Sequence, residues 1–383
     1  MQPTTTTLHV RAHILRNTSF TNWDAEVRGR WDWHQLMADE NYRKGWISFD
    51  GVLWHPELKQ LFCGLMELEA DIFYRFDPAS GAFQSLGFRE HGSPYDAKFH
   101  RSMLLDDNGA LFCATSMLHD PDRQAEAPGG RIIHYDPRAH AYRQVAIPIP
   151  RQYIQSIALD RRRRLIYGFT YPAEYFFQHD LKTGETRQLA FLGNPNGMCQ
   201  PHVAVVDRAG WLWGQWGENR AFDDVPCLNL HLFKYHPDEG RIHWLRHTLA
   251  RPRDGDVGAI DGMCLAPDGN IYIGTKGASL FRLRPEAEQL EYLGRPGPRA
   301  RMSGMVAGPD GRIYLACGER EECGLYSLDP AHDTLTHHGH IRDEALGASA
   351  ERIHDLTVTE DLVLYAGEND NHDRSSYLWE LRP

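Results

Sequence analysis

The feature that most constrains the fold is a phrase that recurs along the whole chain. An aliphatic or β-branched run is followed by a turn, in most copies Asp or Pro-Asp with Gly, and then by a second apolar run. Seven copies start at residues 51, 102, 156, 203, 262, 304 and 355, at spacings of 42 to 59 residues. Asp-Gly and Asn-Gly pairs between apolar runs supply the positive φ of tight hairpin turns. Each copy therefore predicts the first hairpin of a repeating unit.

The segment after each hairpin carries a second strand pair, as in SLFRLRPEAEQLEYLG from residue 279. Four strands in about 40–50 residues is the period of a β-propeller blade. The sequence predicts an all-β, seven-bladed β-propeller. The last blade contains only three strands, and LHVRAHIL at residues 8–15 alternates like a strand without a blade of its own, so this segment is expected to pair into the last blade and close the ring. No linker interrupts the series, and residues 1–383 are expected to form one domain. A β-sandwich or two smaller barrels are the alternatives.

Composition narrows the classes of function. Hydrophobic residues make up 42% of the chain, which is enough for a large core, and the net charge of −11 argues against nucleic-acid binding through phosphates. No segment approaches the roughly 20 apolar residues that span a bilayer, so no membrane partner is expected. Seven cysteines without a CxxC pair indicate a reducing compartment. These features predict a cytoplasmic protein, or a secreted or periplasmic one if a leader was removed, that is a monomer or a weak homo-oligomer.

Propeller geometry predicts which residues share a face. The innermost strand of each blade starts at one face, and the loop after the second strand returns to that face. His100 precedes the first strand of blade two, and His119 follows its second strand, so both are expected on one rim of the central channel. The same rule places further titratable groups on this rim: Lys98, Tyr153, Tyr171, Tyr175, His202, Arg220, Lys276, Arg301, Arg320 and His354. Such a set suits an anionic oligosaccharide or polysaccharide, because Arg, Lys and His bind carboxylates.

The stretch YDAKFHRSMLLDDNGALFCATSMLHD from residue 95, with APGGRIIHYDP after it, resembles a blade of propeller-fold polysaccharide lyases. These are the ulvan lyases and the L-rhamnose-α-1,4-D-glucuronate lyases, which cleave next to a glucuronate by β-elimination. The resemblance implies that His100 and His119 match a histidine pair, that Tyr153 matches a tyrosine one blade later, and that Arg220 matches a later arginine. The second loop of blade three departs from that pattern, because FTYPAEYFF stands where an arginine is expected.

The predicted chemistry is removal of a proton next to a uronate carboxylate, followed by loss of the oxygen at C4. This reaction needs a base, an acid and neutralisation of the carboxylate. His100 or His119 is expected to take the proton, and Tyr153 or Tyr171 to protonate the leaving oxygen. Arg220 and the second histidine would hold the carboxylate, and Lys98, Tyr175, His202, Lys276, Arg301, Arg320 and His354 would bind the rest of the substrate. No cofactor is required for this chemistry.

Two other interpretations stay open. A metal-dependent lyase or lactonase would need a cation such as Ca²⁺ or Mn²⁺, for which His202, Asp261, His354 and Glu368 are the candidate ligands by position. A noncatalytic propeller that binds a glycan or a protein is the other, since fold alone does not determine function. The THHGH run at 336–340 is interpreted as an outer strand, Arg161–Arg164 as a solvated turn, and Trp216 as a candidate sugar platform.

Overall fold

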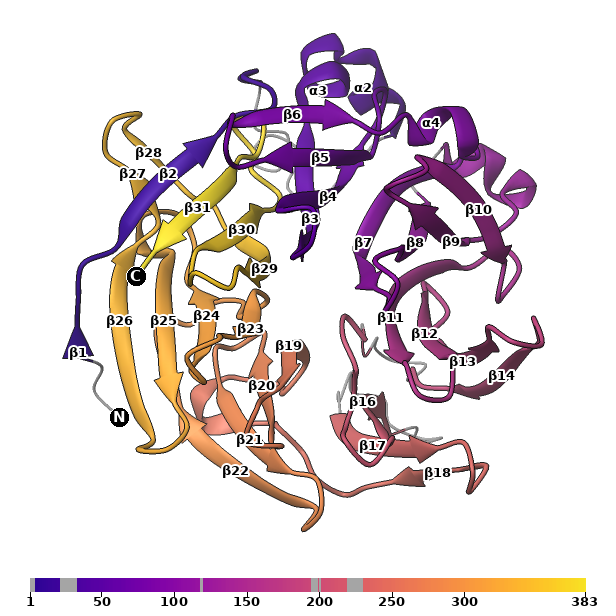
Figure 1. Ribbon diagram of the computed structural model, residues 1–383, viewed down its shortest axis with the longest axis vertical. Coiled ribbons are helices and arrows are strands. Elements are labelled where there is room, and N and C mark those ends of the chain that lie inside the picture. Colours follow the sequence, from indigo (N-terminus) through magenta and orange to yellow (C-terminus); the bar gives the residue numbers. More distant parts are fainter. Residues whose placement is uncertain (1–3, 21–32, 118–119, 194–198, 200, 219–229) are drawn as a thin grey trace.

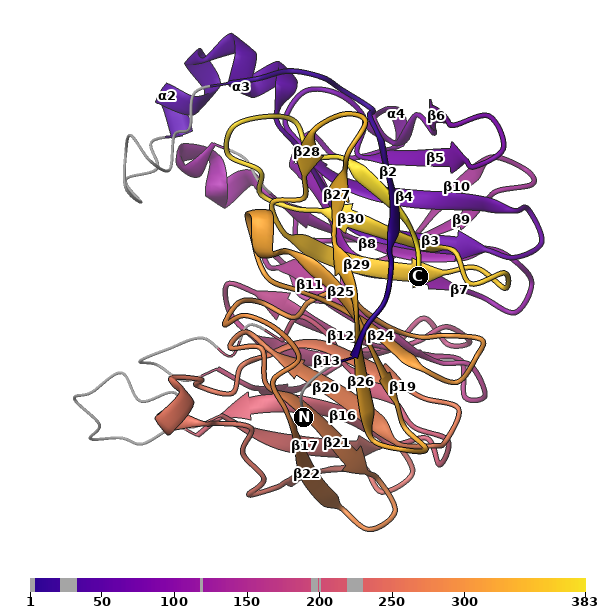
Figure 2. The same ribbon diagram turned by 90° about the vertical axis from the view of Figure 1, so that its left-hand side faces the viewer.

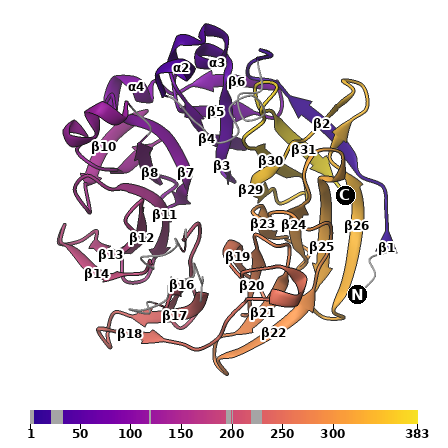
Figure 3. The same ribbon diagram turned by 180° about the vertical axis from the view of Figure 1, so that it is seen from behind.

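The strands form seven blades arranged around a common axis, as Figure 1 shows. The computed structural model describes residues 4–20, 33–117, 120–193, 199, 201–218 and 230–383. Within these residues, each blade contains four antiparallel strands with its first strand nearest the axis, and blade six has a fifth strand at its outer edge. The view from behind shows the same order of blades (Figure 3). The predicted β-propeller is confirmed.

The first four blades contain the strands in chain order. Their bounds are β3 (Ile47–His55), β4 (Gln60–Glu67), β5 (Phe73–Asp77) and β6 (Ala82–Ser85); β7 (Asp96–Leu105), β8 (Leu111–Met117), β9 (Ile132–Asp136) and β10 (Ala141–Ala146); β11 (Tyr153–Asp160), β12 (Leu165–Tyr171), β13 (Tyr175–Asp180) and β14 (Thr186–Phe191); β15 (Val205–Val206), β16 (Leu212–Gly217), β17 (Leu230–His236) and β18 (Arg241–Trp244).

The last three blades follow the same pattern, and the N-terminal segment adds to two of them. Their bounds are β19 (Ile260–Leu265), β20 (Ile271–Thr275), β21 (Leu280–Arg284) and β22 (Gln289–Gly294); β23 (Met305–Ala307), β24 (Ile313–Cys317), β25 (Gly324–Asp329) and β26 (Thr334–His340), with β1 (Thr4–Thr5) parallel to β26; β29 (Ile353–Val358), β30 (Leu364–Glu368), β31 (Leu378–Arg382) and β2 (His9–His13). A two-stranded ribbon, β27 (Arg342–Asp343) and β28 (Ala348–Ser349), lies between blades six and seven in the chain.

The N-terminal strand completes the last blade. Strand β2 pairs antiparallel with β31, from His9 opposite Arg382 to His13 opposite Leu378. His13 Nε2 lies 3.1 Å from Glu380 Oε2, and both side chains are buried. The predicted pairing of LHVRAHIL into blade seven is therefore confirmed.

Apolar side chains between neighbouring sheets form the core. Phe49 and Phe76 of blade one pack with Tyr365 and Leu378 of blade seven, and equivalent clusters join the other blades. Trp213 belongs to such a cluster, and its indole N–H donates to Asp207 Oδ2 at 2.7 Å. Alternating side chains of a strand bury one face against each neighbour, which explains why every blade carries apolar residues in nearly continuous runs.

The recurring turns of the repeat lie at one end of the inner strands. Gly109, Gly210, Gly269 and Gly311 each have a positive φ between 81° and 91° in these turns. The Arg161–Arg164 segment forms the equivalent turn of blade three and makes ion pairs with acidic residues, as in the 2.8 Å contact between Arg161 and Asp107. Both turn predictions are thus confirmed.

Short helices occupy the opposite end of the inner strands. Helices α2 (Trp33–Ala38) and α3 (Glu40–Gly45) come directly before β3 and project from this face in Figure 2. The other helical segments in the part of the chain that the structure describes are α4 (Phe88–His91) and the 3-10 turns Pro121–Glu126, Pro252–Asp254 and Arg320–Glu322. Among the described residues, no helix has the length and apolar character needed to cross a membrane.

Candidate functional site

A pocket of about 270 Å³ opens at the axis, on the face where the inner strands begin. Side chains from several blades meet there, although they are far apart in the sequence. The pocket is lined by Met66, Lys98, His100, Ser116, Tyr153, Gln155, Tyr171, His202, Arg301, His354, Asn369 and Asp370. The lining is mostly polar and contains many groups that can exchange protons.

A β-bulge near the start of the inner strands explains why polar side chains meet at the axis. The pairing register skips one residue in four blades, so Asp50, Gln155, Asp261 and His354 have no partner on the second strand. In blade two the skipped segment includes His100. A bulge re-aims the side chain of the unpaired residue, and bulges are common next to functional sites.

The corresponding residues of blades four and six lie just before their short first strands. Together with the bulged residues they form what we call the axial ring: Asp50, His100, Gln155, His202, Asp261, Ser303 and His354. Each of the seven is at most 7% exposed. Because polar groups are costly to bury without a partner, this ring must be stabilised by contacts among its own members and their neighbours.

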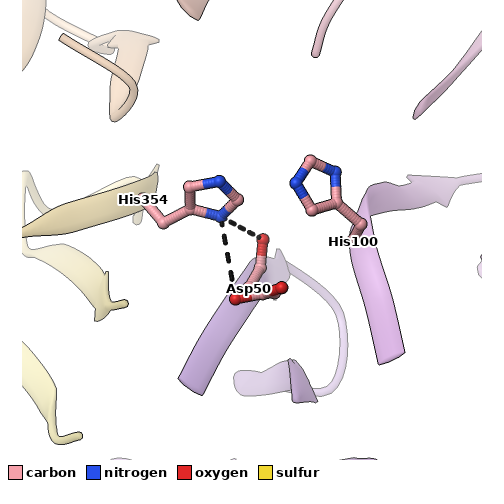
Figure 4. Close-up of side chains that lie close together, drawn as sticks. All are labelled: Asp50, His100 and His354. Atoms are coloured by element: carbon pink, nitrogen blue, oxygen red, sulfur yellow. Dashed lines mark hydrogen bonds and ion pairs between the residues drawn. The ribbon is translucent and has the colours of Figure 1, made fainter. Parts of the chain in front are cut away.

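Three imidazoles of the axial ring lie against one another. The ring centroids of His100 and His202 are 5.4 Å apart and stacked, and those of His100 and His354 are 4.8 Å apart. His100 Nδ1 lies 2.6 Å from the Gln155 carbonyl oxygen. His354 Nδ1 lies 3.1 Å from the Asp50 carbonyl oxygen, a contact that Figure 4 shows. A carbonyl oxygen only accepts, so both Nδ1 atoms carry the proton and both Nε2 atoms of the neutral rings keep a lone pair.

Burial keeps these three histidines neutral. Desolvation lowers the pKa of His100 and that of His354 well below the usual value, and nearby cationic groups lower them further. Burial also lowers the pKa of His202 to about 3, against the opposing effect of Asp261. At neutral pH the pocket therefore presents neutral imidazoles, which can accept a proton or coordinate a cation.

Asp261 is the centre of a second network. Arg301 donates two hydrogen bonds to its carboxylate, from Nε and Nη2, at 2.8 Å each, and Ser303 donates a third at 2.9 Å. His202 Nδ1 lies 3.2 Å from Asp261 Oδ1. Burial alone would raise the pKa of Asp261, but Arg301 and His202 together hold that pKa well below its usual value. The carboxylate is thus ionised, and His202 Nδ1 is the ring nitrogen nearest to it.

Asp50 is held differently, by a lysine and an amide. Lys98 Nζ lies 2.5 Å from Asp50 Oδ2, and Asn369 Nδ2 donates to Asp50 Oδ1 at 2.7 Å. The Asp50 carboxylate is fully buried, and burial raises its pKa despite the charge of Lys98. The two pocket cations Lys98 and Arg301 therefore each face a carboxylate of the axial ring.

Two tyrosines form one wall of the pocket. The rings of Tyr153 and Tyr171 lie 5.1 Å apart, at opposite positions of the β11–β12 pair. Burial raises the pKa of Tyr153, so its hydroxyl stays protonated. A protonated phenol beside a neutral imidazole provides the two groups that acid–base catalysis needs.

Arg101 crosses the axis below the pocket. Its guanidinium extends from blade two to the opposite side of the ring and donates to the carbonyl oxygens of Asp261 and Ser303. Desolvation lowers its pKa, while the carboxylates of Asp261 and Asp355 raise it. The side chain links blades two, five and six directly beneath the site.

The structure brings most of the predicted site residues together. Seven line the pocket: Lys98, His100, Tyr153, Tyr171, His202, Arg301 and His354. Lys276 lies near Asp261 and Arg301, and burial lowers its pKa to about 8. His119 and Arg220 fall outside the described residues, so their positions stay predictions.

Two predicted substrate-binding residues lie elsewhere. Tyr175 begins the third strand of its blade, opposite Phe191 of the fourth, and packs its ring against Phe191 at a centroid distance of 5.6 Å. Arg320 begins a 3-10 turn, lines a separate cleft with Ser349 and Glu351, and pairs with Glu351 at 3.1 Å. The rule that second-loop residues face the channel is therefore wrong for these two, because the backbone after the second strand has already turned away from the axis.

Trp216 and the THHGH run lie away from the axial pocket. Trp216 packs its indole against Trp244 and donates to the Leu232 carbonyl, and it does not line the axial pocket. The THHGH run belongs to β26, the fourth strand of blade six, where His338 bonds Thr6 and Ser327. This position agrees with the interpretation of the run as an outer strand.

Sequence reasoning missed Asp50, Arg101, Asn369 and Asp370. Asp50 precedes the first copy of the repeat at the same position as His354 in the last copy, so an alignment of all seven copies would have found it. Arg101 follows His100 directly, but nothing in the sequence indicates that it reaches across the axis. Asn369 and Asp370 follow the second strand of blade seven, beside the predicted Glu368.

The predicted metal ligands do not come together as one set. Glu368 accepts hydrogen bonds from both Nη atoms of Arg374 at 2.9 Å, and Asp261 is bound by Arg301. A different set does: one ligand atom each from Asp50, His100 and His354 lies within 4.8 Å of the others (Figure 4). All three residues are buried.

Comparisons with known proteins identify the fold. No family model and no curated protein matches the chain. A streptogramin B lyase structure superimposes with a TM-score of 0.63 at 11% identity, covering 98% of this chain and 97% of that one. Catalytically inactive virginiamycin B lyase from Staphylococcus aureus with quinupristin gives 0.62 at 10% identity, covering 98% and 99%.

A chain of the mitotic checkpoint complex is also similar, with a TM-score of 0.57 at 12% identity and coverage of 88% and 90%. All these identities are low, so the similarities show the fold alone. The chain is a β-propeller protein whose structural neighbours include lyases. None of these three neighbours is an ulvan lyase or a rhamnose-glucuronate lyase.

Proposed function

We propose that the protein is a lyase that cleaves a uronate-containing oligosaccharide or polysaccharide by β-elimination. The observation that carries this proposal is the axial pocket, in which a carboxylate-oriented neutral imidazole, two tyrosines and two cations meet. The resemblance of residues 95–120 to a blade of uronate lyases and the presence of lyases among the structural neighbours support the same reaction class.

His202 is the base that the geometry favours. Its Nδ1 faces the ionised Asp261 at 3.2 Å, which leaves the Nε2 lone pair to take the C5 proton. The carboxylate then stabilises the imidazolium that forms, as an oriented acid residue does in other acid–base pairs. His100, the base expected from the sequence, has a carbonyl oxygen as its Nδ1 partner, which cannot offset a full positive charge as well.

The remaining groups fit the other requirements. Tyr153 or Tyr171 donates a proton to O4 as the C4–O4 bond breaks and a C4–C5 double bond forms. Lys98 is the pocket cation that can leave its partner more easily, because its ammonium group contacts one oxygen of Asp50, whereas Arg301 donates two hydrogen bonds to Asp261. It is positioned to bind the uronate carboxylate, whose neutralisation lowers the energy of the developing carbanion.

The test is an ultraviolet assay for the unsaturated uronate product. The protein is incubated with rhamnosyl-glucuronate oligosaccharides and with ulvan, with and without added divalent metal. A rise in absorbance that is absent in His202→Ala supports the proposal. No product from several uronate polymers under either condition would overturn it.

A noncatalytic glycan-binding propeller is the alternative. The large exposed hydrophobic residues among those described are Ile14, Phe191, Trp244, Val257 and Leu346, which come from different elements and so do not favour a protein-binding propeller. Glycan binding without product formation would favour this alternative.

A further inference from the structure

We infer that the axial ring contains a binding site for one divalent transition-metal cation, held by Asp50, His100 and His354. The site does not depend on the proposed lyase activity, and it differs from the ligand set that the sequence suggested. Blades one, two and seven each contribute one ligand. Residues 50, 100 and 354 become neighbours only when the propeller folds.

The three ligand residues converge on one point. Their ligand atoms lie within 4.8 Å of one another, and all three residues are buried. Two imidazoles and one carboxylate are a donor set that Zn²⁺, Co²⁺ and Fe²⁺ bind in other proteins. Because the three side chains come from bulges at equivalent points of their blades, the backbone itself directs them to one place.

The atoms behind the ligands fix their orientation. A histidine that binds a metal usually donates its other N–H to a carbonyl or carboxylate, which fixes the ring and the tautomer. His100 does this, toward the carbonyl oxygen of Gln155. His354 Nδ1 faces both the Asp50 carbonyl oxygen, at 3.1 Å, and Asp50 Oδ1, at 3.9 Å, which holds this ring against Asp50 (Figure 4). Asn369 supports Asp50 in the same way through Oδ1. All three ligands are therefore held in place by the protein before any cation binds.

The ammonium group of Lys98 would compete with the metal ion for the Asp50 carboxylate. This group lies 2.5 Å from Asp50 Oδ2 and compensates a carboxylate that is itself fully buried. A divalent cation on Asp50 would repel Lys98 toward the pocket opening, where its side chain is already partly exposed. The released ammonium group would then be free to bind a substrate carboxylate. Binding of the metal ion would thus break the ion pair between Lys98 and Asp50 and make the ammonium group of Lys98 available to a substrate.

His202 stays outside this set. Its ring stacks on His100 at 5.4 Å, but its Nδ1 is directed to Asp261. The base of the proposed reaction and the cation site are therefore separate parts of the same pocket. Hard cations such as Ca²⁺ and Mg²⁺ prefer oxygen ligands, so we expect them to bind this nitrogen-rich set poorly.

The experiment uses Co²⁺ as the probe, because its visible absorption reports nitrogen coordination. Chelator-treated protein is titrated with CoCl₂, and Zn²⁺ and Ca²⁺ are tested as competitors. We expect one Co²⁺ per chain, displaced by Zn²⁺ and unaffected by Ca²⁺. His354→Ala and Asp50→Asn should each weaken binding by more than about 100-fold, since loss of an outer contact alone typically costs about 10- to 100-fold. No saturable visible band with the wild-type protein would overturn the inference.

Lys98→Met provides a test with the opposite sign. Removing the competing ammonium group should tighten Co²⁺ binding by about tenfold or more, a result that misfolding would not produce. His340→Ala, at an exposed position of the outer THHGH strand, is the matched control and should leave binding unchanged. Unchanged or weaker binding in Lys98→Met would contradict the competition, and weakened binding in His340→Ala would place the cation on the surface.

The outcomes separate the two proposals. Co²⁺ binding without product from any uronate glycan would support the metal site and overturn the proposed lyase function. Product formation by a protein that binds no Co²⁺ would support the proposed lyase function and overturn the metal site.

Discussion

The two ends of the inner strands differ in what the sequence repeats and what it varies. At one end, the turns of most blades use the same Asp and Gly positions, and Gly109, Gly210, Gly269 and Gly311 adopt nearly the same φ. At the other end, the seven equivalent positions of the axial ring carry Asp, His, Gln and Ser. The repeated residues therefore form the turns that stabilise each blade. The varied residues lie at the end of the inner strands where a ligand can bind.

Burial adds to the contrast between the two ends. The turn end satisfies its polar groups locally, as when Asp207 Oδ1 accepts from the backbone of Ala209 and Trp211 at 2.9 Å each. The pocket end satisfies its polar groups across blades, as when Arg101 reaches Asp261 and Ser303. Changes at the turn end should alter stability, and changes at the pocket end should alter function.

The largest expected effect comes from the base. His202→Ala should lower the rate of product formation by about 10²- to 10⁴-fold, which is the usual contribution of a general base. His55→Ala is the matched control, because His55 is also buried but bonds the Gly109 carbonyl at the turn end. That variant should lose stability and keep its rate per folded molecule. Equal losses of rate in His202→Ala and His55→Ala would contradict the functional difference between the two ends of the inner strands.

The next effect concerns the seam between the N-terminal strand and the last blade. The hydrogen bond from His13, followed by that from Arg382, lowers the pKa of Glu380 to about 2. The stability this provides is present above pH 4.5 and is lost as the pH falls toward 2. A shift from 4.5 to about 2 corresponds to at most about 3–4 kcal/mol, and solvent screening of this partly exposed group reduces that value. Denaturant unfolding at pH 7 and pH 3 should show a smaller pH dependence for Glu380→Gln than for the wild type; identical dependence would show that the seam contributes nothing.

A smaller effect is expected from a turn glycine. Gly311 has a φ of +82°, and a Cβ added there would meet no atom within 4 Å. Gly311→Ala should therefore cost only the backbone strain of the left-handed region, about 1–2 kcal/mol. Thermal or denaturant unfolding measures this loss, and the lyase rate per folded molecule should not change. A lowered rate would mean that the turn end communicates with the pocket.

The smallest effect comes from Lys276, near the pocket. Burial lowers its pKa to about 8, so the folded protein disfavours the ammonium form that the unfolded chain retains until pH 10.5. The unfolded state then binds more protons, and stability should rise with pH. Relative to Lys276→Met, the wild type should gain about 1 kcal/mol between pH 7 and pH 9. Unfolding curves at both pH values test this, and a gain of the same size in the variant would refute it.

The fold could be predicted from the sequence because its signal is local and repeated. Alternating strands, turn residues and spacing identify seven blades, and the unpaired N-terminal strand indicates its partner in the last blade. Each hairpin of the repeat lies within a few dozen residues of the next. The N-terminal strand has no blade of its own, and only the three-stranded last blade can accept it.

The candidate site could be predicted only in part, for physical reasons. The face of Lys98, His100, Tyr153 and His354 follows from the order of strands. The pairing of Arg301 with Asp261 does not, and Arg320 faces another cleft, because both depend on contacts between blades that sequence spacing does not describe. Asp50 lies at the equivalent position of blade one, but its role depends on its contact with Lys98 of the next blade, which sequence spacing does not describe either.

The most direct test of the functional site is a crystal structure of His202→Ala with a glucuronate-containing oligosaccharide. We predict that the sugar lies in the axial pocket, with its uronate carboxylate near Lys98 and its C5 facing the position of the missing imidazole. A sugar bound only at the turn end, or in the cleft beside Arg320, would contradict the claim that the variable end of the inner strands is the functional site.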